Sequence, residues 1–218
     1  KIINYVERQI MQGSYKRGDK LPPERELAAL LGASRNSVRE GLGILERMGA
    51  ISSQQGAGNF ISDNFEKTLI EVMTLMFILE EGTFREISEF RYALETQALS
   101  LAMKNITEEQ QTDIEYYMSM LEQTPGEEQK AYYDKKIHYT ITAASGNRFI
   151  IDNLQALTEV MDVFIKDMRA KILSDGSNSE GLMSAHRQMV EALREKDESK
   201  GLKALKAHFE YIYAYIDG

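Results

Sequence analysis

The strongest constraint on this chain is a change in sequence pattern near residue 64. Before it, glycines and prolines interrupt the chain repeatedly, as in "MQGSYKRGDKLPPE", which contains two glycines and a Pro-Pro pair. Such turn signals limit residues 1–63 to short helices and a small hairpin. Beyond residue 64, apolar residues recur with the period of an α-helix over long stretches. The sequence therefore predicts a mainly α protein with a short mixed region followed by an all-helical one.

Helix breaks set the expected boundaries. "TEEQ" at 107–110 is a capping box that begins a helix, and "SGN" (145–147) and "SDGSNS" (174–179) are typical breaks. We expect a first domain over 1–63, a linker with the first helix of the second domain over 64–83, and a bundle of six to seven helices over 84–218. The expected helices cover residues 66–80, 84–104, 108–122, 127–144, 147–173, 179–195 and 198–216.

Charge differs between the two regions. The net charge of −8 for the whole chain is unusual for a nucleic-acid-binding protein. Residues 1–63, however, contain nine Lys or Arg against seven Asp or Glu, whereas the remainder contains seventeen against 27. A mildly basic module can therefore be joined to an acidic one, and the total charge does not exclude DNA as a partner.

Composition also limits the kinds of site and compartment. The chain has no cysteine, which excludes disulfides, thiolate metal ligands and a cysteine nucleophile. No apolar run approaches the roughly 18 to 20 residues that span a bilayer, and the opening "KIINYVERQI" is not a signal peptide. We expect a cytoplasmic protein with no membrane contact.

Residues 22–62 predict a winged helix-turn-helix. A helix from Glu24 to about Leu31 is stopped by Gly32, and Ser34 can cap a second helix that runs to about Met48. A glycine-containing hairpin, "SSQQGAGNFIS", follows as the wing. The residues expected on the apolar faces of the two helices are Leu27, Leu30, Leu31, Val38, Leu42, Leu45 and Met48.

The outer side of the second helix carries groups suited to DNA. Arg35, Asn36 and Arg39 lie near its start, the end that enters a major groove in such domains. Arginine can bind guanine, and asparagine adenine, through two hydrogen bonds each, while Ser34 and Ser37 can bind phosphates. A surface helix can carry arginines without this role. The helix-turn-helix and the glycine-rich wing in register favour DNA binding.

The N-terminal region resembles a known family. It reads "LPPERELAALLGASRNSVREGL..LE..GAI....GAGNFI", which is similar to the DNA-binding domain of GntR-family transcription regulators, "LPSERELA..LGVSR.TVREAL..LE..GL....G.GTFV". The resemblance covers about residues 1–62. It implies that Arg25, Arg35 and Arg39 contact operator bases or phosphates. It also implies that Gly56, at the wing tip, approaches the minor groove.

This chain departs from the family pattern at three positions. Ala33 replaces a valine in the turn, Asn59 replaces a threonine in the wing, and Gly41 replaces an alanine in the recognition helix. Gly41 and Gly43 should each weaken that helix by roughly 1 kcal/mol relative to alanine. Neither change affects the expected contact residues.

All three histidines lie in the helical region. One of them has an aspartate four residues earlier on the same helix face, and the other two lie on apolar stripes and should point inward. A single inward histidine is usually a core residue with one hydrogen bond, but burying three without a shared purpose is costly. Such a set suits Zn²⁺ best, or Ni²⁺, Mn²⁺ or Fe²⁺, and leaves coordination positions open. The expected ligands are Asp134, His138, His186 and His208.

The helical region resembles the FCD effector domain of the FadR subfamily of GntR regulators. The matching pieces are "FRYALETQALSLA", "DKKIHYTITAASGN", "AHRQMVEAL" and "ALKAHFEYI". The resemblance implies the same four metal ligands and a small carboxylate effector. It also implies that Arg91 binds the effector's carboxylate, with a salt bridge to Glu95 as the alternative. Asn147 is a further effector candidate, with a helix N-cap as its alternative.

The leading function is a ligand-responsive transcription regulator of a metabolic operon, and not an enzyme. A homodimer would match two half-sites on double-stranded operator DNA, and effector binding at the metal would change the spacing of the two DNA-binding domains. Two alternatives stay open. One is a metal-dependent hydrolase, for which no additional general base is evident. The other is a helical interaction module with a structural metal.

Overall fold

Two compact units form the chain. The computed structural model describes residues 1–62, 65–174 and 176–216, with side chains described except at 127, 163–174 and 176–179. The units are Lys1–Val72 and Met73–Gly218, so the division falls inside the linker range expected from the sequence. Each unit encloses its own cluster of buried apolar side chains.

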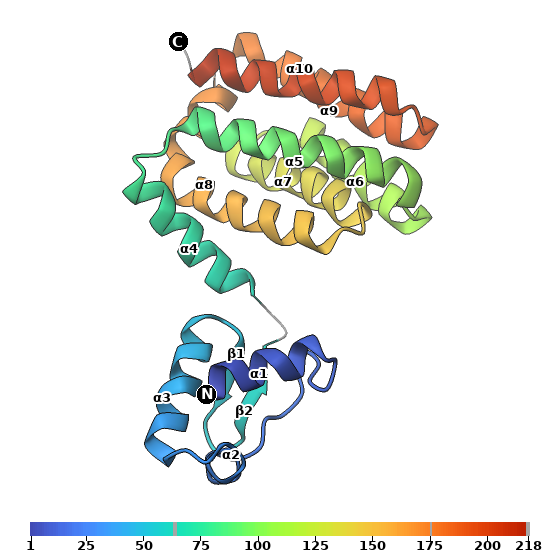
Figure 1. Cartoon of the computed structure of the whole chain (residues 1–218). Helices are drawn as coiled ribbons and strands as arrows, with labels where there is room; N and C mark the ends of the chain where they lie inside the picture. Colours follow the sequence, from blue (N-terminus) through green and yellow to red (C-terminus); the bar gives the residue numbers. More distant parts are fainter. Residues whose placement is uncertain (63–64, 175, 217–218) are drawn as a thin grey trace. The chain divides into compact units, whose positions relative to one another are not determined.

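Residues 1–62 of the first unit form three helices and a two-stranded hairpin (Figure 1). Strands β1 and β2 pair antiparallel, with Ile51 opposite Ile61. The winged helix-turn-helix predicted from the sequence is confirmed. Its elements are α1 (Ile2–Met11), α2 (Glu24–Leu31), α3 (Arg35–Arg47), β1 (Ile51–Gln54) and β2 (Gly58–Ile61). Its buried core is Ile2, Val6, Leu21, Leu27, Ala28, Val38, Leu42, Leu45, Ile51 and Ile61.

The turn between α2 and α3 is made by local backbone chemistry. Gly32 ends α2 in the left-handed conformation, at φ 54°, which glycine adopts without a steric penalty. Ser34 then caps α3, because its hydroxyl oxygen accepts a hydrogen bond from the backbone N–H of Ser37 at 3.1 Å. These two residues let the chain reverse within a few positions and fix where α3 begins.

Two apolar positions were assigned wrongly from the helical period. Leu30 is 61% exposed, because the short helix α2 turns Leu27 and Ala28 inward instead. Met48 is 52% exposed, because α3 ends at Arg47 and Met48 is its C-cap, outside the last helical turn. Period alone is least informative in such short helices and at their ends.

The second unit is helical, and the expected helix bounds are confirmed to within one residue except at α9, which begins three residues early. Thr83 and Thr107 begin α5 and α6 as capping boxes, the second of which was predicted. No helix among the described residues is long and apolar enough to span a bilayer. The helices are α4 (Glu66–Leu79, which crosses the boundary between the units), α5 (Phe84–Asn105), α6 (Glu108–Gln123), α7 (Glu127–Ala144), α8 (Arg148–Ser174), α9 (Gly176–Glu195) and α10 (Glu198–Ile216).

Helix α5 runs through the middle of this unit. It packs against α7, α8 and α10, while α9 packs against α6, α8 and α10 (Figure 1). The core therefore joins helices that are far apart in the sequence. Its largest fully buried side chains include Leu99, Ile114, Ile137, Met189, Leu193, Leu205 and Phe209. Any polar side chain that points into this core from α7, α9 or α10 meets side chains from the other helices.

The packing of α1 against α3 explains why position 41 is a glycine, which the sequence did not reveal. A Cβ at this position would collide with Cγ2 of Ile2, which is buried in the core of the first unit. Gly43, two residues later, has only the Nη1 atom of Arg47 near its own Cβ position, at 3.6 Å. The missing side chain of Gly41 therefore lets α1 approach α3, while Gly43 has no such role.

Alanine substitutions at the two glycines should have opposite effects on stability. Gly41→Ala should destabilise the chain by about 1–3 kcal/mol, because overpacking exceeds the gain in helix propensity. Gly43→Ala should stabilise it by about 0.5–1 kcal/mol, because its Cβ has space. Urea unfolding followed by circular dichroism measures both. Stabilisation by Gly41→Ala would contradict the packing argument.

Candidate functional site

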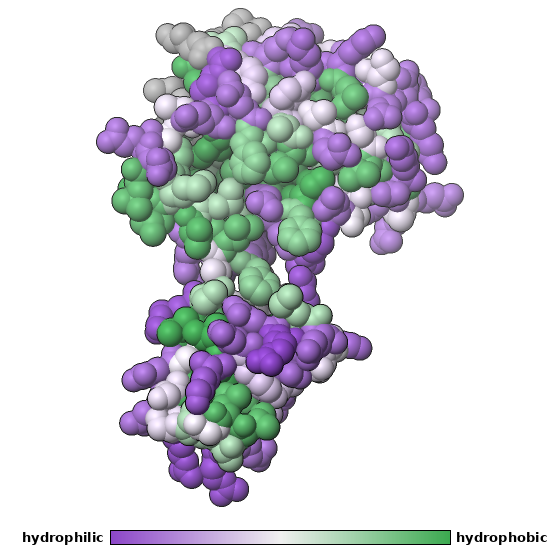
Figure 2. Space-filling model, in the orientation of Figure 1, coloured by the Kyte–Doolittle hydropathy of each residue, from purple (hydrophilic) through white to green (hydrophobic). Residues whose placement is uncertain are grey.

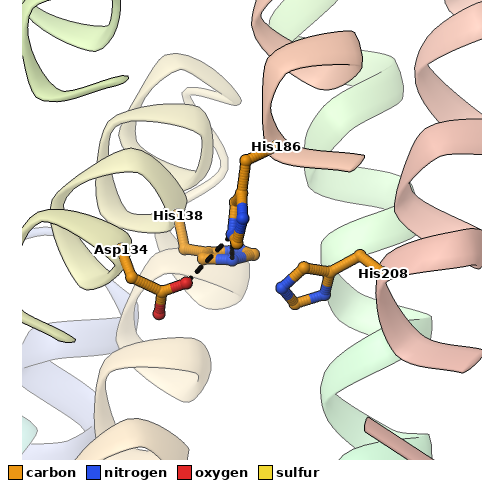
Figure 3. Close-up of side chains that lie close together, drawn as sticks. All are labelled: Asp134, His138, His186 and His208. Carbon is orange, nitrogen blue, oxygen red and sulfur yellow. Dashed lines mark hydrogen bonds and ion pairs between the residues drawn. The ribbon is translucent and has the colours of Figure 1, made fainter. Parts of the chain in front are cut away.

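Four potential metal ligands meet inside the helical unit. They come from three helices: Asp134 and His138 from α7, His186 from α9 and His208 from α10 (Figure 3). One possible ligand atom from each lies within 4.8 Å of all the others. The three histidines are buried and the aspartate is half-buried. The structure thus brings together all four residues that were expected to share an ion.

In two of the imidazoles, a hydrogen bond at Nδ1 determines which ring nitrogen carries the proton. His138 Nδ1 lies 2.7 Å from Oε2 of Glu95, and His186 Nδ1 lies 2.9 Å from the carbonyl oxygen of Leu182. An ionised carboxylate and a carbonyl can only accept, so each Nδ1 donates and carries a proton. In the neutral form, Nε2 of each ring then presents a lone pair to the interior of the cluster.

Several lone pairs converge as a result. His138 Nε2 lies 3.1 Å from His186 Nε2, which in turn lies 3.0 Å from Oδ1 of Asp134. A proton on His186 Nε2 could be donated to His138 Nε2 or to Asp134 Oδ1, but the other contact would still join two acceptors. A divalent cation would face all of the donors at once.

His208 completes the donor set. Its Nδ1 is buried and makes no hydrogen bond within the described part of the chain. Burial, followed by the neighbouring His186 and His138, holds the pKa of His208 well below its ordinary range. The ring is therefore neutral at pH 7. In Figure 3 its other nitrogen, Nε2, faces Asp134, His138 and His186, so the ring offers the cluster a third imidazole donor. Three imidazoles and one carboxylate are a donor set that fits a divalent metal ion.

Arg91 and Glu95 form a buried pair on α5. Arg91 Nε donates to Oε1 of Glu95 at 2.5 Å, and both side chains are more than 90% buried. Burial alone would raise the pKa of Glu95, but the Arg91 guanidinium and His138 together lower it to about 2. The salt bridge that the sequence left as the alternative for Arg91 is thus present. Sequence reasoning missed that Glu95 also contacts His138; a glutamate on the inward stripe of a helix was the available signal.

Asn147 lies at a helix start. Its Oδ1 accepts hydrogen bonds from the backbone N–H groups of Phe149 and Ile150, at 3.1 and 3.3 Å. The side chain is exposed. The N-cap of α8, which was the alternative for this residue, therefore accounts for its side-chain oxygen without an effector.

A cavity of about 360 Å³ lies beside the cluster, between α6, α7 and α9. Asp134 and His186 line it, and its wall also carries Lys130, Glu122 and Arg187. Arg187 is paired with Glu122 at 2.6 Å. The volume suits a small ligand, which could reach Asp134 and His186 from this side. Neither Arg91 nor Asn147 is among the described residues that line the cavity.

The residues expected to contact DNA lie on one exposed edge of the first unit. Ser34, Arg35, Asn36, Ser37 and Arg39 occupy the cap and the first turns of α3, and all of them are exposed. The hydroxyls of the two serines lie 3.0 Å apart within the cap. The helix start therefore presents two arginines and an asparagine to solvent.

Arg39 has a partner in this structure. Its Nε and Nη2 donate to the carboxylate of Glu24 on α2, with Nη2 2.7 Å from Oε2, and this contact lowers the pKa of Glu24. The pair is exposed, so it contributes little to stability and water competes with it. A phosphate or base edge could replace Glu24 as the acceptor at low cost.

The wing and α2 supply the remaining candidates. Gly56, in the turn between β1 and β2, has φ 77°, and nothing lies within 4 Å of the position that a Cβ would occupy. Arg25, on α2, is exposed like the residues of α3. Both are thus accessible to a large partner, and the glycine tip carries no side chain that would obstruct a narrow groove.

Comparisons with known proteins give matches to both units. The model of the family "Bacterial regulatory proteins, gntR family" matches residues 1–61, and the FCD domain model matches residues 86–211. An Escherichia coli (strain K12) protein, provisionally named an L-lactate dehydrogenase operon regulatory protein, is 26% identical over 217 residues, which cover 97% of this chain and 83% of that protein.

Two further matches agree with these models. The Glc operon transcriptional activator of Escherichia coli (strain K12) is 30% identical over 166 residues, which cover 73% of this chain and 65% of the activator. The solved structure of a Streptococcus agalactiae GntR protein has a TM-score of 0.70 and 23% identity, and the match covers 98% of this chain and 97% of that one. At this identity, the structural match supports the fold alone.

The orphaned nitrogen of His208 predicts a stability effect that changes sign with metal. In buffer with a chelator, His208→Leu should stabilise the chain by about 1–2 kcal/mol, because it removes a buried polar atom without a partner. With Zn²⁺ at 100 times its Kd, the wild type should gain about 2.7 kcal/mol that the variant largely lacks. Thermal unfolding in the two buffers measures both effects.

A neighbouring core substitution serves as the control. Phe209→Leu should destabilise the chain by a similar amount with and without Zn²⁺, because Phe209 is a fully buried apolar residue. If His208→Leu is destabilising to the same extent in both buffers, His208 is an ordinary core residue.

Proposed function

The chain belongs to the GntR family of bacterial regulatory proteins and carries an FCD domain, and on this basis we propose that it is a metal-dependent, carboxylate-responsive regulator of a metabolic operon. The observation that carries the proposal is the buried cluster of three histidines and one aspartate in the FCD domain. The relatives' names support operon regulation, and one of them refers to L-lactate dehydrogenase, whose substrate is a small carboxylate. The protein is proposed to act by binding rather than by catalysis.

DNA recognition is assigned to the start of α3. Arg35 and Asn36 are exposed at the helix end that enters the major groove in helix-turn-helix proteins, and their side chains make no hydrogen bond to the described residues that DNA would have to break. Arg39 would exchange Glu24 for an acceptor on DNA. Ser34, Ser37 and Arg25 would bind phosphates, with Gly56 of the wing near the minor groove.

Replacing Arg35 should weaken operator binding. Arg35→Ala should reduce affinity for the operator by about 1–3 kcal/mol, or roughly 10- to 100-fold, because a bidentate contact to guanine is lost. Gel shifts with DNA from upstream of the gene measure this effect. Arg47→Ala, in the last turn of the same helix, removes an equal charge far from the reading end and should change affinity much less. Equal affinity of Arg35→Ala and wild type would refute the assignment.

The metal is assigned to Asp134, His138, His186 and His208. Neutral imidazole nitrogens and a carboxylate oxygen are ordinary ligands of Zn²⁺, and Ni²⁺, Mn²⁺ or Fe²⁺ accept the same set. Such an ion supplies a positive centre with open positions, to which a carboxylate can bind. The four side chains would hold the ion in place, and the cavity that Asp134 and His186 line would give a ligand access to it.

The effector is proposed to be a small carboxylate that binds at the ion. The cavity lined by Asp134 and His186 is large enough for such a molecule. Its wall contains Lys130 and Arg187 but also Glu122 and Glu180, so the ion itself would supply the positive charge that attracts a carboxylate. Arg91 is the proposed second contact, because its bond to Glu95 uses Nε and leaves the terminal amino groups out of that bond. A ligand held by residues of α5, α7 and α9 would bias how these helices pack.

A homodimer is the proposed assembly. Two-fold symmetry would place two copies of α3 on the two half-sites of an operator. Helix α4 supports this proposal, because Leu75, Met76, Ile78 and Leu79 are each more than half exposed. Figure 2 shows hydrophobic surface where this helix lies. An apolar helix face of this kind is typical of a protein interface.

A thermal-shift screen tests the regulatory function. Small mono- and dicarboxylates should raise the unfolding temperature of the Zn²⁺-loaded chain, and the effective compound should change operator binding in gel shifts. The double variant His186→Ala/His208→Ala should lose both the metal, by elemental analysis, and the response to carboxylate. Full metal occupancy in this variant would exclude the proposed site. Turnover of the bound compound would favour a hydrolase instead.

A further inference from the structure

Glu95 occupies an unusual position between the metal cluster and Arg91. It lies on α5, which supplies none of the four expected ligands, and its side chain is 6% exposed. Both carboxylate oxygens are used: Oε1 accepts from Nε of Arg91 at 2.5 Å, and Oε2 lies 2.7 Å from Nδ1 of His138. One buried carboxylate thus connects a cation on its own helix to an imidazole on α7.

The contact with Arg91 determines what Glu95 can do for His138. A guanidinium only donates hydrogen bonds, so Glu95 faces Arg91 as a carboxylate acceptor through Oε1. Its second oxygen, Oε2, faces His138 as an acceptor in the same way. Nδ1 of His138 must therefore carry the proton, and Nε2 is left with the lone pair that faces His186 and the cluster.

The other two imidazoles are held differently. His186 Nδ1 is oriented by the backbone carbonyl of Leu182, which no substitution of a side chain removes. His208 Nδ1 has no hydrogen-bond partner within the described part of the chain. His138 is thus the histidine of the cluster whose orientation depends on another residue's side chain, and that residue is Glu95.

We infer that Glu95 is the positioning residue of the metal site: by holding Nδ1–H of His138, it directs Nε2 at the ion and sets the site's metal affinity. The inference rests on the proposed metal site. A carboxylate that binds the outer nitrogen of a metal-ligating histidine fixes its tautomer and increases its basicity. The Arg91–Glu95 pair accordingly serves the metal centre as well as the packing of α5.

The substitution Glu95→Gln separates the role of Glu95 in packing from its role at the metal site, because glutamine has nearly the same shape as glutamate. Arg91 requires an acceptor, so the glutamine oxygen should turn toward Arg91 and the amide NH₂ toward His138. His138 Nδ1 would then have to accept, which places the ring proton on Nε2, where the ion should bind. The side chain still fills its space, but it imposes the wrong tautomer.

Zn²⁺ affinity tests the inference. In competition with a chromophoric chelator, Glu95→Gln should bind Zn²⁺ about 10- to 100-fold more weakly than wild type, the usual effect of losing such a partner. Glu89→Gln is the matched control: it is the same substitution on the same helix, at a carboxylate that pairs with Arg85 at 2.9 Å on the surface. It should leave Zn²⁺ affinity unchanged. Wild-type affinity in folded Glu95→Gln would overturn the inference.

A measurement on the wild type covers the case in which Glu95→Gln does not fold. The ¹⁵N shifts of His138 in the metal-free chain should show a protonated Nδ1 and an unprotonated Nε2. The opposite tautomer would overturn the inference. If the wild type itself binds no Zn²⁺, the proposed metal site fails. If it binds Zn²⁺ and Glu95→Gln binds equally well, only the role of Glu95 fails.

Discussion

The convergence of three imidazoles and one carboxylate inside an apolar helical core is the constraint on which the second unit depends. His138, His186 and His208 are almost fully buried, and one possible ligand atom of each lies within 4.8 Å of the others and of an Asp134 oxygen. Burying such groups is unfavourable unless each is paired. A cation at their centre would pair these groups and thereby connect α7, α9 and α10. These helices would then depend on the ion as well as on the apolar core.

The supporting contacts of the cluster explain why α5 matters although it supplies no ligand. Its Glu95 contacts His138, and its Arg91 neutralises that glutamate in the core. The guanidinium also lies over the ring of Phe209 on α10, with its carbon 5.6 Å from the ring centre. Helices α5, α7 and α10 are thus joined by one buried network. Repacking any one of them would disturb the donors, which is the physical basis for coupling a ligand to helix positions.

Much of this organisation could be predicted from the sequence, because the signals are local. Apolar period, capping boxes and breaks at "SGN" located six of the seven C-terminal helices to within one residue. The predicted burial of Leu30 and Met48 was wrong, because a helical period is poorly defined in a short helix and at a helix end. The start of α9 was also misplaced, because polar residues that usually end a helix are included in it. The role of Gly41 could not be predicted, since it depends on Ile2 of another helix.

The sequence by itself determined the helix-turn-helix, the helical second unit and the identity of the four clustered residues, because turn chemistry, periodicity and the small number of histidines are all written along the chain. Only the tertiary structure decided which atoms face one another. It paired Glu95 with both Arg91 and His138, used Asn147 as a cap and placed Arg39 on Glu24. Such pairings depend on distances between helices that are remote in sequence, and a hydrogen bond requires those distances to be correct to a few tenths of an ångström.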